Sequence, residues 1–451
     1  MIPARTFEDF ETPLDAGVIP APQVSHGSLP LPLILFLFAI FLPEEGSFNI
    51  GDLRMTVARA IMIVFAPVCF YKFFSLVSQG NYRFIWSDLL IPALGVWIIF
   101  ANAMNDGFSE TIKTSGVNAL EVVMPYLIAR SWLKDRESNF QAMRYFCIGA
   151  SVVGLLAILD VLTGRYFIRE LFSTVTGYIK IIDKDFRFGM IRAASTAEHP
   201  ILLGSICMLA IIMGTQLKGA LRQWVIGSCL IGIFLSVSSA PIGGMLIGLL
   251  ALLYERTMKR IAFRWVFVFW GIAFFLVAVI AIHPNPRGFL IGLVALNTES
   301  AYFRLYLFDW VQPYIEANPF FGIGIRNSII SATDLPTTLD SEWYVLALFD
   351  GIPAAVLVFF GLLGALGNSA DAKRKKIEMS LDEINLNFAL TVCIVLSVYV
   401  GTTVLFWGVA QSAVFLTAGL CANSRSLPAR SDAQPDEDYG NELELAAVEN
   451  S

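Results

Sequence analysis

Charged residues are scarce in this chain of 451 residues. Only 15% of the residues are Asp, Glu, Lys or Arg, whereas an ordinary soluble protein has about 25%. Phenylalanine alone occurs 36 times, against 31 Lys and Arg together, and hydrophobic residues make up 56% of the chain. A single water-soluble core cannot bury so much apolar surface, so an ordinary soluble enzyme is excluded.

The side chains that commonly bind metals and nucleotides are also few. Histidine occurs three times, and the chain has no GxxxxGK[ST] motif, no HExxH motif and no histidine–carboxylate cluster. We therefore expect no metal, no cofactor and no nucleic-acid partner. The cysteines all fall inside apolar runs, which predicts small core residues rather than disulfides; they are Cys69, Cys147, Cys207, Cys229, Cys393 and Cys421.

The apolar residues are concentrated in blocks of roughly the length that crosses a bilayer. They predict an all-α polytopic membrane protein with about twelve transmembrane helices. The expected spans are 29–43, 54–74, 87–105, 116–133, 144–162, 199–216, 223–238, 241–255, 265–283, 341–367, 386–404 and 405–423. The membrane domain would cover 29–424, between a disordered tail at 1–28 and an acidic disordered tail at 425–451.

Short loops rich in Lys and Arg predict the orientation, because such loops stay in the cytoplasm. Basic clusters follow the fourth, sixth, eighth and tenth spans, and all four lie on one side if both termini are cytoplasmic. The longer segments 163–198 and 284–340 are then external. The first of them is itself basic, which suits an anionic ligand. For Arg165 and Arg169, near the end of a span, contact with lipid headgroups explains the charge equally well.

Several short motifs follow one another in a recognisable order. The stretch 192–204 reads RAASTAEHPILLG, and SVSS follows at 236–239 in a tight break between two spans. SAYFR occupies 300–304, NPFFGIG occupies 318–324, and LDSEW at 339–343 leads into a span that contains Asp350-Gly351. In this order the motifs resemble the O-antigen ligase and Wzy-type polymerase superfamily, particularly its exopolysaccharide-polymerase branch, over roughly residues 50–420.

The resemblance implies a glycosyltransferase C-like membrane fold with a helical external loop before the third-last span. It also implies an undecaprenyl-diphosphate-linked glycan as donor and acceptor, no metal, and a place in the bacterial inner membrane, where other polysaccharide export components are further partners. Two departures matter: Ser238 is followed by Ser239-Ala240 where many relatives have an arginine, and the loop ends in Asp340-Ser341-Glu342 where ligases usually have a histidine. The second departure favours a polymerase-like relative.

Three arginines are candidate ligands of the donor diphosphate, because a guanidinium binds phosphate through two parallel hydrogen bonds. They are Arg187 and Arg192 in the first external loop and Arg304 in the second. Arg304 is expected on an amphipathic helix over 300–317 that ends at Asn318-Pro319, with Tyr306 or Leu307 and Trp310 in its apolar stripe. Tyr306 and Trp310 are candidate stacking surfaces for sugar rings, although a helix lying flat at the membrane interface explains the same pattern.

Asp340 and Glu342, at the mouth of the tenth span, are the candidate catalytic bases. Each can accept a proton from a sugar hydroxyl, although an acid at a helix N-terminus is also explained by capping, with Asp340 as the N-cap. His199 is a further catalytic candidate, and His199 and Glu198 are next in line for the base. Because Pro200 favours a helix start near His199, a structural cap is the simpler interpretation of this histidine.

Three further charged residues fall inside expected spans, where charge is unfavourable unless it is paired. Arg54 and Arg59 are expected on one helix, with Arg59 about 7–8 Å deeper in the membrane, and Glu121 is a candidate counter-ion. They would contact the residues that bind the substrate and would not contact the substrate themselves. A buried structural network explains them equally well.

Two other functions compete with the glycosyltransferase. Twelve spans also suit a secondary transporter or a flippase of lipid-linked oligosaccharide, but such a protein should have an internal repeat with matching helix breaks, and the sequence has neither. A non-catalytic partner in polysaccharide export is the third hypothesis. We expect an inverting, metal-independent transfer on the outer face of the membrane.

Overall fold

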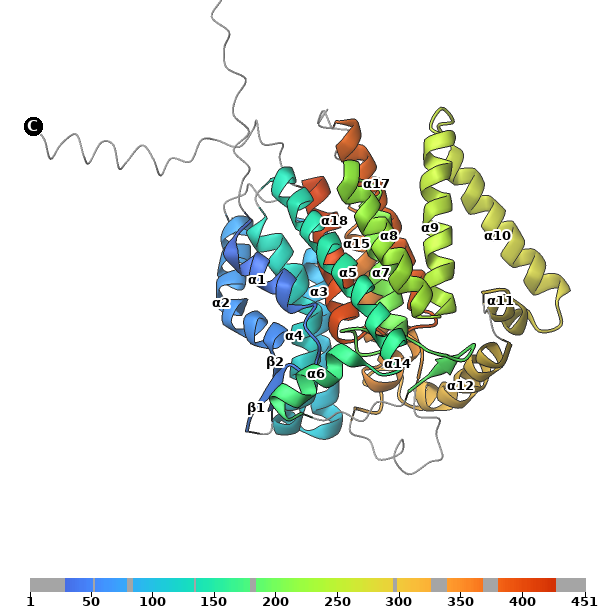
Figure 1. Cartoon of the computed structure of the whole chain (residues 1–451). Helices are drawn as coiled ribbons and strands as arrows, with labels where there is room; N and C mark the ends of the chain where they lie inside the picture. Colours follow the sequence, from blue (N-terminus) through green and yellow to red (C-terminus); the bar gives the residue numbers. More distant parts are fainter. Residues whose placement is uncertain are drawn as a thin grey trace, which may run out of the picture.

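The computed structural model describes residues 29–51, 53–78, 84–133, 135–178, 184–294, 298–325, 339–367 and 380–426. Within these ranges the chain is helical apart from two short antiparallel hairpins (Figure 1). The hairpins consist of β1 (Ser47–Ile50) with β2 (Leu53–Thr56), and of β3 (Phe186–Arg187) with β4 (Met190–Ile191).

The helices of the N-terminal half are α1 (Leu31–Ala39), α2 (Val57–Ser78), α3 (Ser87–Asp106), α4 (Phe108–Trp132), α5 (Arg136–Thr163), α6 (Phe167–Thr176) and α7 (Pro200–Gly214). Those that follow are α8 (Gly219–Leu235), α9 (Ser239–Thr257), α10 (Arg264–Ile282), α11 (Pro286–Val294), α12 (Thr298–Ala317), α14 (Glu342–Phe349), α15 (Ile352–Gly364), α17 (Leu381–Val400) and α18 (Gly408–Ser426). The predicted all-α fold class is confirmed for the described part of the chain.

Five of the described helices, α2, α3, α5, α10 and α17, are long and apolar enough to cross a membrane. The apolar helices α7, α8 and α15 are shorter. The chain is therefore a helical membrane protein, but the predicted count of twelve spans is not confirmed. The first expected span, 29–43, contains only the nine-residue helix α1, which rises about 14 Å, less than half of the hydrocarbon thickness.

Helix α10 illustrates why these helices belong in lipid. Only Val279 is buried among its 19 residues, and large side chains such as Phe267, Trp270 and Phe274 are exposed. In Figure 1, α10 leans away from the bundle beside α9. An apolar surface of this size is unfavourable in water and favourable against acyl chains.

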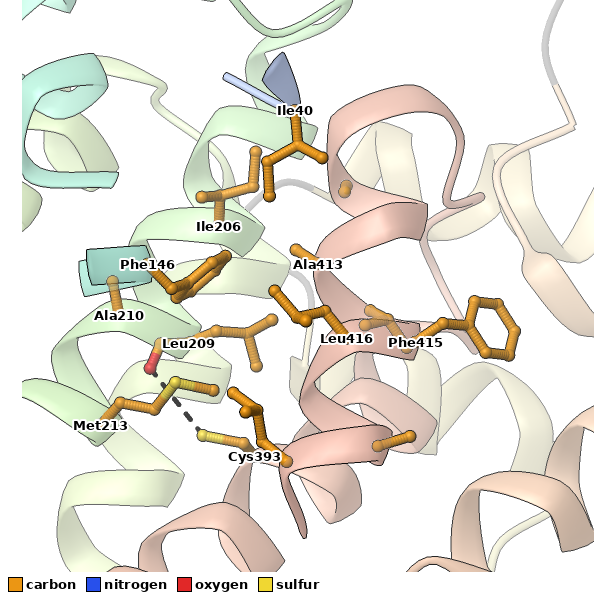
Figure 2. Close-up of a cluster of buried hydrophobic side chains, with 14 of the residues drawn as sticks. Ile40, Phe146, Ile206, Leu209, Ala210, Met213, Cys393, Ala413, Phe415 and Leu416 are labelled. Atoms are coloured by element: carbon orange, nitrogen blue, oxygen red, sulfur yellow. Dashed lines mark hydrogen bonds between the residues drawn. The ribbon is translucent and has the colours of Figure 1, made fainter. Parts of the chain in front are cut away.

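The core of the bundle surrounds α7, in which every residue except Ile201 is buried. Helices α5, α8, α9, α17 and α18 pack against it. Figure 2 shows part of this core, where Phe146 of α5, Leu209 of α7 and Leu416 of α18 meet. All six cysteines are buried and free, as predicted, and Cys393 Sγ lies 3.8 Å from the carbonyl oxygen of Leu209.

The described parts of the two predicted external loops lie at one end of the bundle. In Figure 1 the hairpin β1–β2, helix α6, helix α12 and helix α14 gather at the lower end, which we call the hairpin end. The starts of α5, α8 and α17 lie at the other end, which we call the opposite end. Segments that are 100 residues apart in sequence thus share one face of the protein.

One of the expected spans is interrupted by a short break. The span 341–367 consists of α14 and α15, which are separated at Asp350-Gly351. The peptide N–H of Ile323 donates to the carbonyl of Leu348 (2.8 Å) across this break. Gly351 has φ +84°, and a Cβ there would lie 1.9 Å from the carbonyl oxygen of Phe320. The motifs at 318–324 and 350–351 are therefore in contact, and only glycine fits at 351.

The position of Arg54 corrects the prediction. Arg54 lies on β2 and not on a helix, so it is not placed above Arg59 along one helix axis. Arg59 is the third residue of α2, and its Nη1 donates to the carbonyl oxygen of Arg54 (3.3 Å). The expected span 54–74 therefore begins at Val57, because residues 53–56 pair with β1.

Some predictions fall outside the described residues. These are the tail 1–28, most of the tail 425–451, of which only residues to 426 are described, and the end of the second loop from 326 to 338. Arg304 belongs to α12, but its side chain lies outside the described part.

Candidate functional site

A buried non-helical segment, residues 191–198, leads into α7 at the hairpin end. Buried peptide groups need hydrogen-bond partners, and the carboxylate of Asp160 at the end of α5 supplies them. Its Oδ2 accepts from the peptide N–H groups of Ala194 (3.1 Å) and Ser195 (2.7 Å), and its Oδ1 accepts from that of Phe167 (3.0 Å). Asp160 thus fixes the segment on the end of the bundle.

Arg192 joins this segment to the break between α8 and α9. Its Nη2 donates to Ser238 Oγ (2.6 Å), its Nε donates to the carbonyl oxygen of Ser236 (3.1 Å), and its Nη1 pairs with Asp185. Only 2% of Arg192 is exposed. The structure brings the arginine and the Ser-x-Ser motif together. Each nitrogen of the guanidinium already has one partner, and its anionic partner is Asp185, which a phosphate would replace.

Arg187 lies on β3, next to the same break. It is half-buried, and its Nη1 donates to the carbonyl oxygen of Val237 (3.3 Å). Val237 has φ +45°, an uncommon backbone conformation for a β-branched residue. Arg187 and Arg192 therefore both donate to backbone carbonyls of this turn.

Glu198 is the last residue of the buried segment and contacts the start of α18. Its Oε1 accepts from the peptide N–H of Val409 (3.3 Å), while its Oε2 is buried and has no hydrogen-bond partner. Gly408 has φ +55°, and a Cβ there would lie 1.9 Å from Glu198 Oε1. Burial raises the pKa of Glu198 to about 7. The carboxyl group is therefore able to gain or lose a proton near neutral pH.

His199 caps α7, as the simpler interpretation predicted. Its Nδ1 accepts from the peptide N–H of Ile201 (3.3 Å), and Pro200 is the first residue of the helix. The ring lies 6.1 Å from that of Trp407. Burial, followed by the charge of Arg192, lowers the pKa of His199 to about 4, so the imidazole is neutral at physiological pH.

A cavity of about 80 Å³ lies beside Glu198. Charged side chains on three other elements line it together with Glu198: Arg59 on α2, Glu121 on α4 and Glu44 before β1. Trp407 and Gly408 form part of its apolar side. The cavity has room for a few water-sized groups.

Ion pairs hold the two arginines of this region. Arg59 Nε donates to Glu121 Oε1 (2.7 Å), so Glu121 is the counter-ion that the sequence indicated. Arg59 Nη2 has no hydrogen-bond partner among the described residues. Arg54 pairs with Glu44 (2.9 Å), and its guanidinium lies 3.8 Å from the ring centre of Tyr178. The network joins the first hairpin to α4 and to the end of α6.

Arg169 lies behind the cavity and is not at the lipid surface. Its side chain is 1% exposed and pairs with Glu45, which is equally buried. Its Nη1 donates to the carbonyl oxygen of Glu198 (3.0 Å). The lipid-headgroup interpretation of Arg169 is therefore wrong, whereas Arg165, half exposed and paired with Glu170 (3.3 Å), remains compatible with it.

The acids at the start of α14 have different surroundings. Ser341 is the N-cap, so Asp340 precedes the cap and the expected capping role of Asp340 is wrong. Glu342 is 6% exposed, and its Oε2 accepts from the peptide N–H of Phe406 (2.9 Å). Its own N–H donates to the carbonyl of Gly401 (2.9 Å). Glu342 therefore holds the connection between α17 and α18.

The predicted amphipathic helix exists as α12 and ends before Asn318, as expected. Leu307 is its buried stripe residue, whereas Tyr306 is 58% exposed. Trp310 packs against Tyr314, with 4.8 Å between ring centres. Tyr306 therefore presents an exposed aromatic ring. Trp310 is partly buried and packs against the apolar cluster between α12 and α14.

The structure gathers Glu198, His199, Arg59 and Glu121 at one place and leaves Glu342 in a separate one. The sequence did not single out Asp160, Glu45, Trp407 and Gly408 as site residues, and for Arg169 it left lipid-headgroup contact open beside a role in anion binding. A carboxylate at the end of a span and a Trp-Gly pair before a helix were visible signals, but neither identifies its contact partner. Among the described residues, no group of three or more His, Cys, Asp and Glu side chains is arranged to hold a metal ion.

Comparison with known proteins identifies no family for this chain. No protein-family model and no curated protein matches the chain. The features that bear on function are the helical membrane fold and the charged cavity at its hairpin end.

Proposed function

We propose that this chain is a glycosyltransferase of the bacterial inner membrane that polymerises or transfers undecaprenyl-diphosphate-linked oligosaccharide. One observation carries the proposal: Glu198 Oε2 and Arg59 Nη2, neither of which has a partner among the described residues, belong to residues that line one cavity. Transfer from a lipid diphosphate needs a proton acceptor for the attacking hydroxyl and a cation for the leaving diphosphate.

The chemistry is an inverting displacement. The Glu198 carboxylate takes the proton of the acceptor hydroxyl while the hydroxyl oxygen forms a bond to the anomeric carbon. The bond from that carbon to the diphosphate oxygen breaks, and its electron pair stays on the diphosphate. Arg59 neutralises the charge that develops on the leaving group, with Arg54 at the same hairpin. Two long lipid-linked chains held side by side supply much of the acceleration through proximity.

This assignment moves the base from Asp340 and Glu342 to Glu198. Glu342 is engaged with a backbone N–H in apolar surroundings, whereas Glu198 has a free oxygen among charged groups. Arg187, Arg192 and Arg304 remain predicted donor ligands. The exposed ring of Tyr306, with Trp310 next to it on α12, offers a stacking surface for the sugar chain.

The proposal requires the hairpin end to face outward and both termini to be cytoplasmic. In a variant without the six native cysteines, a cysteine at the exposed Thr174 of α6 should react with an impermeant thiol reagent in intact cells. A cysteine at the exposed Thr257, near the opposite end, should react only after permeabilisation. The reverse labelling pattern overturns the orientation and the reaction site with it.

The experiment that tests the function follows lipid-linked repeat units in cells that lack the protein. Short units should accumulate on the outer face of the membrane, and the wild-type chain should restore polymer. Arg59→Lys keeps the charge but loses the planar fork, so it should restore little, while the matched change Arg165→Lys should restore fully. Units trapped on the inner face would identify a transporter, and no accumulation would contradict both functions.

A further inference from the structure

A second, larger cavity of about 670 Å³ lies at the opposite end of the bundle. Its walls are the first turns of α5, the connection between α7 and α8, and the first turns of α17. None of its lining residues takes part in the proposed transfer. Its charged lining residues are Arg136, Arg144, Lys218, Glu137, Asp382 and Glu383.

Ion pairs join the elements that line this cavity. Arg136 of α5 pairs with Glu383 of α17 (3.2 Å), and Lys218 before α8 pairs with Asp382 of α17 (2.6 Å). A capping box at Ser380 fixes the start of α17. The two pairs connect α17 to both neighbouring elements, so the walls are positioned without any ligand.

Two polar groups on α5 remain unused by the protein. Arg144 is exposed and makes no hydrogen bond or ion pair within the described part of the chain. Asn139 is 1% exposed, and its buried Oδ1 has no partner. The Asn139 amide has a defined orientation, because its Nδ2 donates to the carbonyl oxygen of Leu420 (3.1 Å). The cavity therefore offers one free cation and one buried acceptor that needs a donor.

The remaining lining fits an amphiphile. Lysine and arginine side chains equal Asp and Glu side chains in number, so the cavity selects for no net charge. Phe140, Leu217, Leu221 and Leu386 supply an apolar side. The cavity lies at the end of a helical membrane bundle, and its apolar side suits the acyl part of an amphiphile.

We propose that this cavity binds a phospholipid headgroup of the phosphoethanolamine type. The phosphodiester pairs with Arg144, and the primary ammonium donates to Asn139 Oδ1 and to the carboxylate of Glu137. A headgroup whose nitrogen has no N–H, such as choline, leaves Asn139 Oδ1 without a hydrogen-bond donor. An anionic headgroup without an ammonium is repelled by the carboxylates of Glu137, Asp382 and Glu383. The acyl chains leave past Leu217 and Leu221.

The test is lipid retention by the purified full-length chain, measured by native mass spectrometry after reconstitution in three mixtures. These contain phosphatidylethanolamine, phosphatidylcholine or phosphatidylglycerol in equal molar excess. We expect about tenfold more retained phosphatidylethanolamine than either competitor, equivalent to about 1.4 kcal/mol. Equal retention of the three lipids overturns the proposal.

Variants assign the contacts. Arg144→Gln should lower retention of all three lipids, and Glu137→Gln should lower only the preference for phosphatidylethanolamine. Arg256→Gln is the matched control, since Arg256 is exposed in the last turn of α9 and does not line the cavity. An Arg144→Gln protein that retains lipid like the control contradicts the phosphate contact.

A soluble source of the same chemistry is distinguished by a separate measurement. In phospholipid-free detergent, glycerophosphoethanolamine should bind at least tenfold more weakly than the lipid, because it lacks the acyl chains that cover the apolar side. Equal binding of the two would overturn the lipid assignment and identify a site for a water-soluble phosphoethanolamine.

Discussion

Two buried glutamates accept from backbone N–H groups around the start of α18, Glu342 in the connection from α17 and Glu198 in the first turn of α18, yet their surroundings differ. Glu342 accepts from the N–H of Phe406 at 2.9 Å, and Glu198 accepts from the N–H of Val409 at 3.3 Å. The space beside Glu342 is about 10 Å³ and mostly apolar, with Trp343 among its lining. The space beside Glu198 is about 80 Å³ and includes Arg59 and Glu121.

The difference separates a structural carboxylate from a chemically available one. Both side chains satisfy a backbone N–H at a helix connection, which is a sufficient reason for an acid at either position. Only Glu198 has, in addition, a free oxygen next to a cavity with a cation. A hydrogen bond from a backbone N–H to a buried glutamate therefore does not by itself indicate function. The indication comes from the second carboxylate oxygen of Glu198 and the charged groups near it.

The largest expected effect comes from removing each charge in turn. Glu198→Gln keeps an acceptor for Val409 but removes the proton acceptor, so polymer formation per inserted protein should fall by about 10²–10⁴-fold. Glu342→Gln keeps its acceptor for Phe406 and should retain polymer formation within a few-fold. Polymer yield and membrane-inserted protein are measured together. Equal activity of the two variants would show that Glu198 is also structural.

The glycine beside each glutamate gives the next comparison. Gly408→Ala puts a Cβ 1.9 Å from Glu198 Oε1 at φ +55°, so the left-handed backbone alone costs about 1–2 kcal/mol and the carboxylate is displaced. Gly401→Ala lies at φ −56°, with its nearest contact at 3.2 Å from Ser397 O. Thermal unfolding in detergent should show a clear loss for the first variant and a small one for the second. Similar melting temperatures for both contradict this packing.

The pH dependence follows from the raised pKa of Glu198. Burial puts this pKa at about 7 instead of 4.5, and a base acts in its ionised form, so activity should rise with a midpoint near pH 7. The same shift stabilises the fold at low pH, and this contribution is lost as the pH rises from about 4.5 through 7. Glu198→Gln should remove that loss in a melting series. A stability curve that the substitution leaves unchanged would refute the shift.

The smallest effect is expected at the exposed ion pair of the same hairpin end. Glu170→Gln breaks a pair with Arg165 in which both side chains are about half exposed. Exposed pairs contribute little, so stability should change by about 0.5 kcal/mol or less and polymer yield should not change. This variant controls for the loss of any carboxylate at the hairpin end. A large loss of polymer yield in Glu170→Gln would show that removal of any carboxylate at the hairpin end impairs activity, so the effect of Glu198→Gln would not be specific.

The sequence by itself determined the membrane class, most helix positions and the residues at several helix ends. Apolar runs predicted α3, α5, α10 and α17, because burial in lipid requires a continuous stretch of one composition. Pro200 predicted the start of α7 with His199 as its cap, and Asn318-Pro319 predicted the end of α12. These features depend on neighbours within a few residues, so the local sequence contains the information.

Only the tertiary structure decided which charged residues meet. Glu198 reaches Gly408 and Val409 across 211 positions, and Arg169 reaches Glu45 across 124. No periodicity or motif encodes such distances, because any buried carboxylate can pair with any cation that the packing brings close. Arg54, expected on a helix, lies on β2 because that strand pairs with β1, where Asn49 is the partner of Arg54.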